Sequence, residues 1–188
     1  SQILFGKMGR LSENSVVNIK NKSHSVTAEI TVPKGGAEGV IVAQGGNIGG
    51  WSLYMKDGKL KYCYNLFGLR YTYVESQAPI AEGDHQVRAE FKYQGGGLGK
   101  GGTLSLFVDG AHAGEGDIGA TAAIIFSADD GCDVGRDTGA PVAQDYGPRG
   151  NAFTGRVKGV QIANPEAAEA ERHLVAPQEA LRIAIARQ

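Results

Sequence analysis

The feature that most constrains this chain is a series of short runs in which apolar and polar residues alternate. In HQVRAEFKY, residues 85–93, every second residue from Val87 to Tyr93 is apolar, and the residues between are polar or charged. A second run of this kind extends from Val26 to Val32. A period of two places successive side chains on opposite faces of an extended backbone, so these runs predict β-strands with one buried face.

Glycine-containing turns separate the runs. Asp57-Gly58 and Asp109-Gly110 each join two alternating segments, as in a two-residue β-hairpin turn. About ten short strands without intervening helices predict an antiparallel β-sandwich, and the lack of crossover helices excludes a parallel α/β fold. The other predicted strands cover residues 39–46, 51–56, 59–65, 69–76, 103–108, 111–118, 122–128 and 153–163.

The sequence divides into three parts. Residues 1–24 are polar and lack alternation, which predicts an irregular lead-in, and residues 25–163 form the predicted all-β domain. Residues 164–188 are rich in alanine and glutamate and predict a short helical tail, in which Leu181, Ala184 and Ile185 share one face. Such a helix needs an apolar surface, either on its own domain or on a partner domain or second subunit.

Composition excludes several classes of function. The net charge of −1 argues against a nucleic-acid-binding protein, and no apolar run approaches the length of about 20 residues that spans a bilayer. The glycines before Lys100 superficially resemble a phosphate-binding loop. However, the spacing fails at Gln94, Gly101 follows the lysine, and a strand rather than a helix comes next. Nucleotide binding is therefore rejected.

The polar stretch from residue 127 to residue 151 is the best candidate for a binding site. Oxygen-rich loops can hold calcium, and the weak candidates for ligands are Asp129, Asp130 and Asp133. Because the EF-hand spacing is absent and arginines dilute the charge, the sequence predicts no metal site. The stretch either caps its own backbone or contacts a ligand or another domain. The candidates for such contacts are Asp133, Arg136, Asp137, Thr138 and Asp145.

No catalytic set is apparent. The histidines lack metal-binding spacing, and no nucleophile elbow or Ser/His/Asp arrangement is present. Cys63 and Cys132 are the only cysteines, and the sequence leaves open whether a disulfide joins them.

Several stretches together resemble the region that follows the catalytic domain in bacterial arylsulfatases. The stretches are GRLSENSVVNIKNKSHSVTAEITVPKGGAEGVIVAQGG, GGWSLYMKDGKLKYCYN, YQGGGLGKGGTLSLFVDG, DVGRDTGAPVAQDY, NAFTGRVKGVQI and the final LRIAIARQ. The resemblance covers nearly the whole chain. It implies a C-terminal accessory domain with a jelly-roll fold like that of laminin-G or concanavalin domains.

The resemblance further implies a parent sulfuric ester hydrolase whose formylglycine, calcium and catalytic residues lie upstream. This domain would hold no cofactor, would not be an enzyme itself, and would pack on the catalytic sulfatase domain, with residues 129–149 shaping substrate access. A homo-oligomer formed through the C-terminal helix is a further expected contact. The expected location is the cytoplasm or periplasm of a bacterium, with the cytoplasm favoured.

One segment partly matches the sulfatase nucleophile motif C-x-P-x-R. Cys132 and Arg136 have the right separation, but Val134 replaces the proline, and no base or metal ligand is in place to activate the thiol. A catalytic role for Cys132 is therefore rejected. The alternative function is a carbohydrate- or polar-ligand-binding sandwich, with Trp51 and the tyrosines of residues 54–73 as a stacking surface. Aromatic residues at alternate strand positions are more often core residues or cross-strand pairs.

Overall fold

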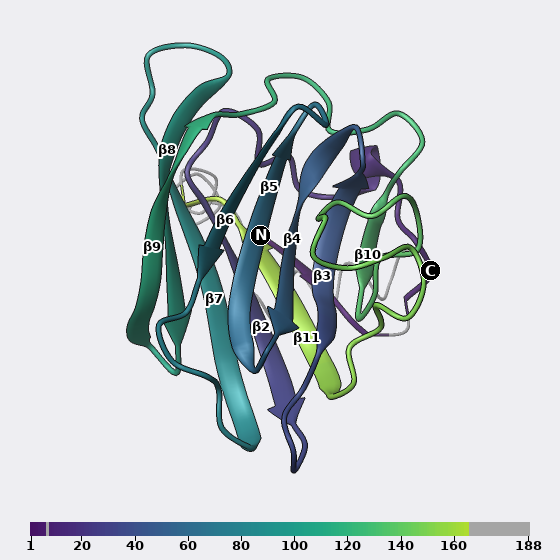
Figure 1. Ribbon diagram of the computed structural model, residues 1–188. Helices are drawn as coiled ribbons and strands as arrows, with labels where there is room; N and C mark the ends of the chain where they lie inside the picture. Colours follow the sequence, from purple (N-terminus) through teal and green to yellow (C-terminus); the bar gives the residue numbers. More distant parts are fainter. Residues whose placement is uncertain (7, 166–188) are drawn as a thin grey trace, which may run out of the picture.

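The protein is an antiparallel β-sandwich in the computed structural model, which describes residues 1–6 and 8–165 (Figure 1). The larger sheet consists of β1 (Gln2–Leu4), β11 (Arg156–Ala163), β2 (His24–Val32), β7 (Gly83–Tyr93), β8 (Lys100–Val108) and β9 (Ala111–Ala120), in that order. The smaller sheet consists of β10 (Cys132–Val134), β3 (Gly39–Gly46), β4 (Gly49–Lys56), β5 (Lys59–Leu66) and β6 (Arg70–Glu75). The predicted β-sandwich is thus confirmed, whereas the predicted tail helices lie outside the described residues.

The alternating runs behave as their period predicts. In β2 the side chains from Val26 to Val32 are buried at every second position, and β7 follows the same pattern. The facing sides of the two sheets form one apolar core in which Trp51 stacks on Tyr62, with ring centroids 6.1 Å apart. Each large side chain buried in this way contributes roughly 1.5–3 kcal/mol of transfer free energy. Trp51, Tyr62 and Tyr64 are therefore core residues and are not available to stack on a ligand.

The two Asp-Gly hairpins are present. Asp57 and Gly58 both have positive φ angles, 53° and 74°, and Asp109 and Gly110 have φ angles of 51° and 81°. Positive φ at both central residues matches the right-handed twist of the flanking strands, as in a type I′ turn.

The predicted strand at residues 122–128 is wrong, because this segment is irregular and belongs to neither sheet. Ala122 and Phe126 are buried, whereas Ile124 is 81% exposed. The backbone N–H groups of Phe126 and Ser127 donate to the Glu13 carboxylate instead of to a neighbouring strand. A continuous apolar run without alternation is weak support for a strand, and here it marks a loop that is anchored at two points.

The described residues of the segment 1–24 are mostly irregular, and they are part of the sandwich. Its β1 pairs with β11 and buries Leu4. Farther along, Leu11 exchanges two backbone hydrogen bonds with Cys132 of β10, with N···O distances of 3.0 and 2.8 Å. The segment therefore connects the edge of the larger sheet with the edge of the smaller one.

A long connection, residues 135–151, lies across the outer face of the smaller sheet and is called the cover loop below (Figure 1, green). Val142 and Ala143 of this loop pack on Val40, Tyr54 and Cys63 in a second buried cluster. Among the described residues, no helix is long and apolar enough to cross a membrane.

Candidate functional site

Two of the predicted contact residues hold the cover loop in place. Asp145 accepts hydrogen bonds from the Tyr54 hydroxyl and from Lys61 Nζ, both at 2.6 Å. Partial burial acts to raise the pKa of Asp145, but the hydrogen bonds from Lys61 and Tyr54 outweigh it, and the pKa lies below its ordinary value. Asp145 is thus an anchor between the loop and the sheet.

Asp137 is buried at the base of the same loop. Its Oδ2 atom accepts hydrogen bonds from the Val142 N–H at 3.0 Å and from the Tyr146 hydroxyl at 2.9 Å. The Asn151 side chain bonds to the Asp137 backbone N–H and C=O. Burial raises the pKa of this carboxyl despite these donors. Asp137 therefore closes the loop on itself.

The weak calcium candidates do not form a shared cluster. Asp130 pairs with Arg10 at 2.6 Å, and Asp133 accepts hydrogen bonds from the N–H and hydroxyl of Thr138 at 3.0 and 2.5 Å. Asp129 is exposed. Within residues 1–6 and 8–165, no group of three or more acidic, histidine or cysteine side chains is arranged to hold a metal ion.

The two cysteines are free and buried in different clusters. Burial raises the pKa of each thiol to about 12. A thiol that stays protonated at neutral pH is a poor nucleophile.

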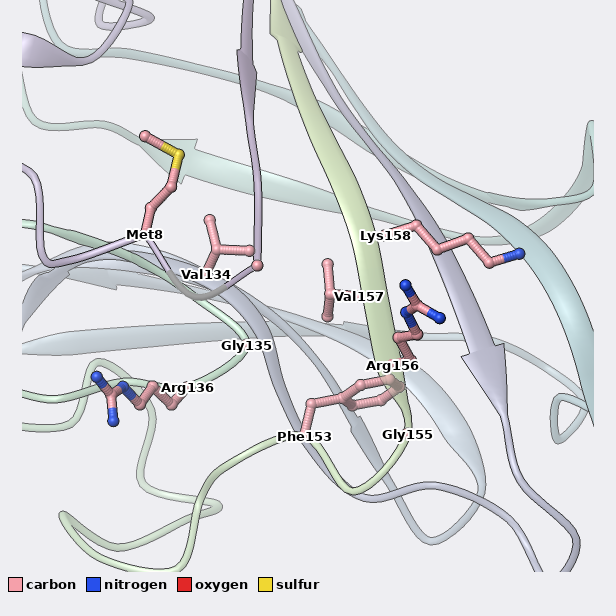
Figure 2. A pocket seen from close by; sticks show the side chains of 10 residues that line it. Met8, Val134, Gly135, Arg136, Phe153, Gly155, Arg156, Val157 and Lys158 are labelled. Carbon is pink, nitrogen blue, oxygen red and sulfur yellow. The ribbon is translucent and has the colours of Figure 1, made fainter.

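The exposed candidate Arg136 lies in a pocket of about 680 Å³ (Figure 2). The pocket lies at the open side of the sandwich, where β10 ends the smaller sheet and where β11 and β1 end the larger one. Its volume falls within the range of roughly 300–1,000 Å³ that is usual for small-molecule sites. The walls are made by Gly6, Met8, Val134, Gly135, Arg136, Phe153, Gly155, Arg156, Val157 and Lys158.

The charged side chains that line the pocket are all cationic. Arg136 comes from the start of the cover loop, and Arg156 and Lys158 come from the outward-facing positions of β11. Lys158 Nζ pairs with Asp84 at 2.6 Å, whereas neither arginine forms an ion pair in the part of the chain that the structure describes. Guanidinium groups present a planar fork of donors that matches a carboxylate, sulfate or phosphate.

The floor of the pocket is apolar and open. Val134 and Phe153 are largely buried, and Val157 and Met8 complete the surface. Gly135 has a φ of +82°, and a Cβ atom built there would meet nothing within 4 Å, so the backbone itself borders the space. Arginine side chains beside an apolar floor can bind an anionic group while the floor contacts the body of a small organic ligand.

Of the predicted contact residues, only Arg136 lines this pocket. The side chains of Asp133, Asp137 and Asp145 accept hydrogen bonds from within the protein. The donor to Asp133 is the Thr138 hydroxyl. The sequence reasoning missed Arg156 and Lys158. The pattern that indicates these residues is a pair of cations at alternate positions of one predicted strand, because alternate side chains lie on the same face.

Comparisons with known proteins give the fold but no family. No protein-family model and no curated protein matches the chain. Among solved structures, the CBM40 module of the Ruminococcus gnavus IT-sialidase is similar, with a TM-score of 0.53, 13% identity and coverage of 97% of both chains. The same module bound to alpha2,6 sialyllactose gives a TM-score of 0.50 at 14% identity and covers 95% of both chains. Mouse laminin alpha1 domains LG4-5 also give 0.50, at 16% identity, over 86% of this chain and 38% of that one. The shared feature is the β-sandwich.

Proposed function

We propose that this chain is a non-catalytic module that binds an acidic saccharide. The observation that carries the proposal is the pocket between the sheet edges, where the floor is apolar and Arg136 and Arg156 form no ion pair with any residue in the described part of the chain. Arg136 or Arg156 would bind the acid group, and the C–H surface of a sugar ring would cover Val134, Phe153 and Val157. A solved neighbour of the same fold, the Ruminococcus gnavus module, is bound to a sialylated sugar, which makes saccharides the first class to test.

Titration calorimetry with sialyllactose and with neutral lactose tests this function. We expect binding of sialyllactose only. Replacing the arginine that binds its carboxylate, in Arg136→Ala or in Arg156→Ala, should lower the affinity about tenfold or more, because a charge-assisted hydrogen bond contributes about 1.5–3 kcal/mol. Arg149→Ala is the matched control, since Arg149 is an exposed arginine of the cover loop outside the pocket. Failure to bind any acidic saccharide would contradict the proposal.

A second candidate function is an accessory domain that packs on an arylsulfatase catalytic domain. The sulfatase parent rests on the sequence resemblance alone, and the comparisons add no support for it. The structural observation that favours docking is a group of exposed apolar side chains at one end of the sandwich. Leu69 is 89% exposed and Ile124 is 81% exposed, and Ile48 and Phe67 lie on neighbouring turns. Exposed apolar groups of this kind often mark contact surfaces.

Docking is tested with the double variant Leu69→Ser, Ile124→Ser. The variant is made in this chain and also in a longer protein that includes the upstream region. We expect the double variant to lower the melting temperature of the longer protein and to leave that of this chain unchanged. Ile3→Ser is the control, because Ile3 is exposed on β1, outside these turns. Hydrolysis of a chromogenic aryl sulfate by the longer protein alone would support the non-enzymatic role of this domain. Hydrolysis by this chain itself would refute it.

A further inference from the structure

We infer that the ligand of the pocket is polyanionic, with at least two acid groups set apart on a saccharide chain. This inference rests on the proposed function and specifies its ligand. It follows from the placement of the cations around the pocket.

The cations lie on opposite sides of the apolar floor. Arg136 follows β10 of the smaller sheet, whereas Arg156 opens β11 of the larger sheet. Figure 2 shows Val157 and Phe153 between them, with the two guanidinium groups pointing in different directions. One small acid group would bind to one of these forks and leave the other unpaired.

Three cations elsewhere in the sandwich have internal partners. Lys61 pairs with Asp145, Lys20 with Glu13 and Arg10 with Asp130, each at 2.6 Å. Arg136 and Arg156 have no ion-pair partner within residues 1–6 and 8–165, and none of the described residues that line their pocket is a carboxylate. Two arginines on opposite sides of the floor, with guanidinium groups that point in different directions (Figure 2), are best neutralised by two separate anionic groups on one ligand.

Lys158 is a third cation of the pocket, and it is held in an ion pair within the protein. Its Nζ atom is bound to Asp84, which also accepts a hydrogen bond from the Thr31 hydroxyl at 2.6 Å. Asp84 therefore competes with an anionic ligand for Lys158. Removing the Asp84 charge would free Lys158 and strengthen binding, an effect that loss of structure would not produce.

The ligand class that fits these features is a sugar chain with repeated sulfate or carboxylate groups. Its acid groups would reach Arg136 on one wall and Arg156 on the other, and the sugar rings between them would lie on the apolar floor. A saccharide with one terminal acid would use only one wall.

The experiment compares three probes by calorimetry, each at low and at physiological salt: lactose, sialyllactose with its single carboxylate, and a chondroitin sulfate tetrasaccharide with alternating carboxylate and sulfate groups. We expect the tetrasaccharide to bind at least tenfold tighter than sialyllactose and to lose more affinity as salt rises. Arg136→Ala and Arg156→Ala should each weaken tetrasaccharide binding about tenfold, whereas Arg149→Ala should not. Asp84→Asn should tighten it about threefold.

Equal affinities for sialyllactose and the tetrasaccharide would overturn the inference while leaving the proposed function intact. Dependence of tetrasaccharide binding on only one of the two arginines would do the same. If neither acidic probe binds, both the inference and the proposed function are wrong.

Discussion

His24, at the start of β2, shows how a single buried residue makes this sandwich sensitive to acid. Its ring contacts Phe91, with centroids 5.3 Å apart, and burial lowers its pKa from 6.5 to about 4. The unfolded chain binds a proton near pH 6.5, whereas the folded chain does not until about pH 4. Folding is therefore opposed by proton binding to the unfolded state as pH falls through this window.

We predict that His24→Phe removes a pH-dependent loss of stability. In the unsubstituted protein, the free energy of unfolding should fall by about 3 kcal/mol between pH 7 and pH 4 because of His24 alone. The variant should lack this part of the slope in urea unfolding measured across the same range. His112→Gln, which changes an exposed histidine, should keep the parent slope. Identical slopes in the parent and His24→Phe would rule out the buried neutral imidazole.

Among the elements, the cover loop depends on a polar network under its apolar contacts. The Tyr146 hydroxyl lies 2.9 Å from Asp137 Oδ2, to which it donates, and 2.9 Å from Ser52 Oγ. The Tyr146 ring also packs edge-on against Tyr54. Since Asp137 and Ser52 are both buried, loss of the hydroxyl would leave two polar groups without a full set of partners.

Tyr146→Phe should therefore lower the free energy of unfolding by about 2 kcal/mol. Urea denaturation followed by fluorescence measures the change. Tyr71→Phe is the matched control, because its hydroxyl lies at the long distance of 3.5 Å from the Asn47 carbonyl, and it should cost less than about 0.5 kcal/mol. A neutral Tyr146→Phe variant would show that the loop is held by its apolar contacts alone.

The elements also show what sequence reasoning can reach. Strands such as β2 and β7 were predictable because alternation is a local property of the chain. The pocket was not predictable as a unit, because Met8, Arg136 and Arg156 come together only when the edges of two sheets meet. Asp137 and Asp145 were expected at a ligand or domain contact, yet both side chains bond within the protein. A run of polar residues gives no sign that its loop folds back onto a sheet.

In the molecule as a whole, residues 1–24 join the two sheets at their open side. The lead-in pairs with β11 through β1 and with β10 through Leu11, and the pocket lies beside this connection. It also carries the buried ion pair of Glu13 and Lys20, whose side chains are only 9% and 8% exposed. Glu13 in addition holds the loop that contains Phe126.

Glu13→Ala should consequently destabilise the whole sandwich by about 3–5 kcal/mol, because Lys20 would keep a buried charge without a partner. The melting temperature and the urea midpoint should both fall. Glu29→Ala, at an exposed position of β2 bonded to Gln86, should change stability by less than about 1 kcal/mol. An effect of Glu13→Ala no larger than that of Glu29→Ala would mean that the lead-in is peripheral to the fold.

The burial of both native thiols has a practical consequence for fluorescence work. Cys63 and Cys132 are the only cysteines of the chain, and burial keeps each protonated at neutral pH. A new cysteine at the exposed position Thr154, next to Gly155 of the pocket wall, would be the one thiol that a maleimide dye reaches quickly. The sequence as it stands is thus a suitable background for attaching a single reporter dye beside the pocket, with neither native cysteine replaced first.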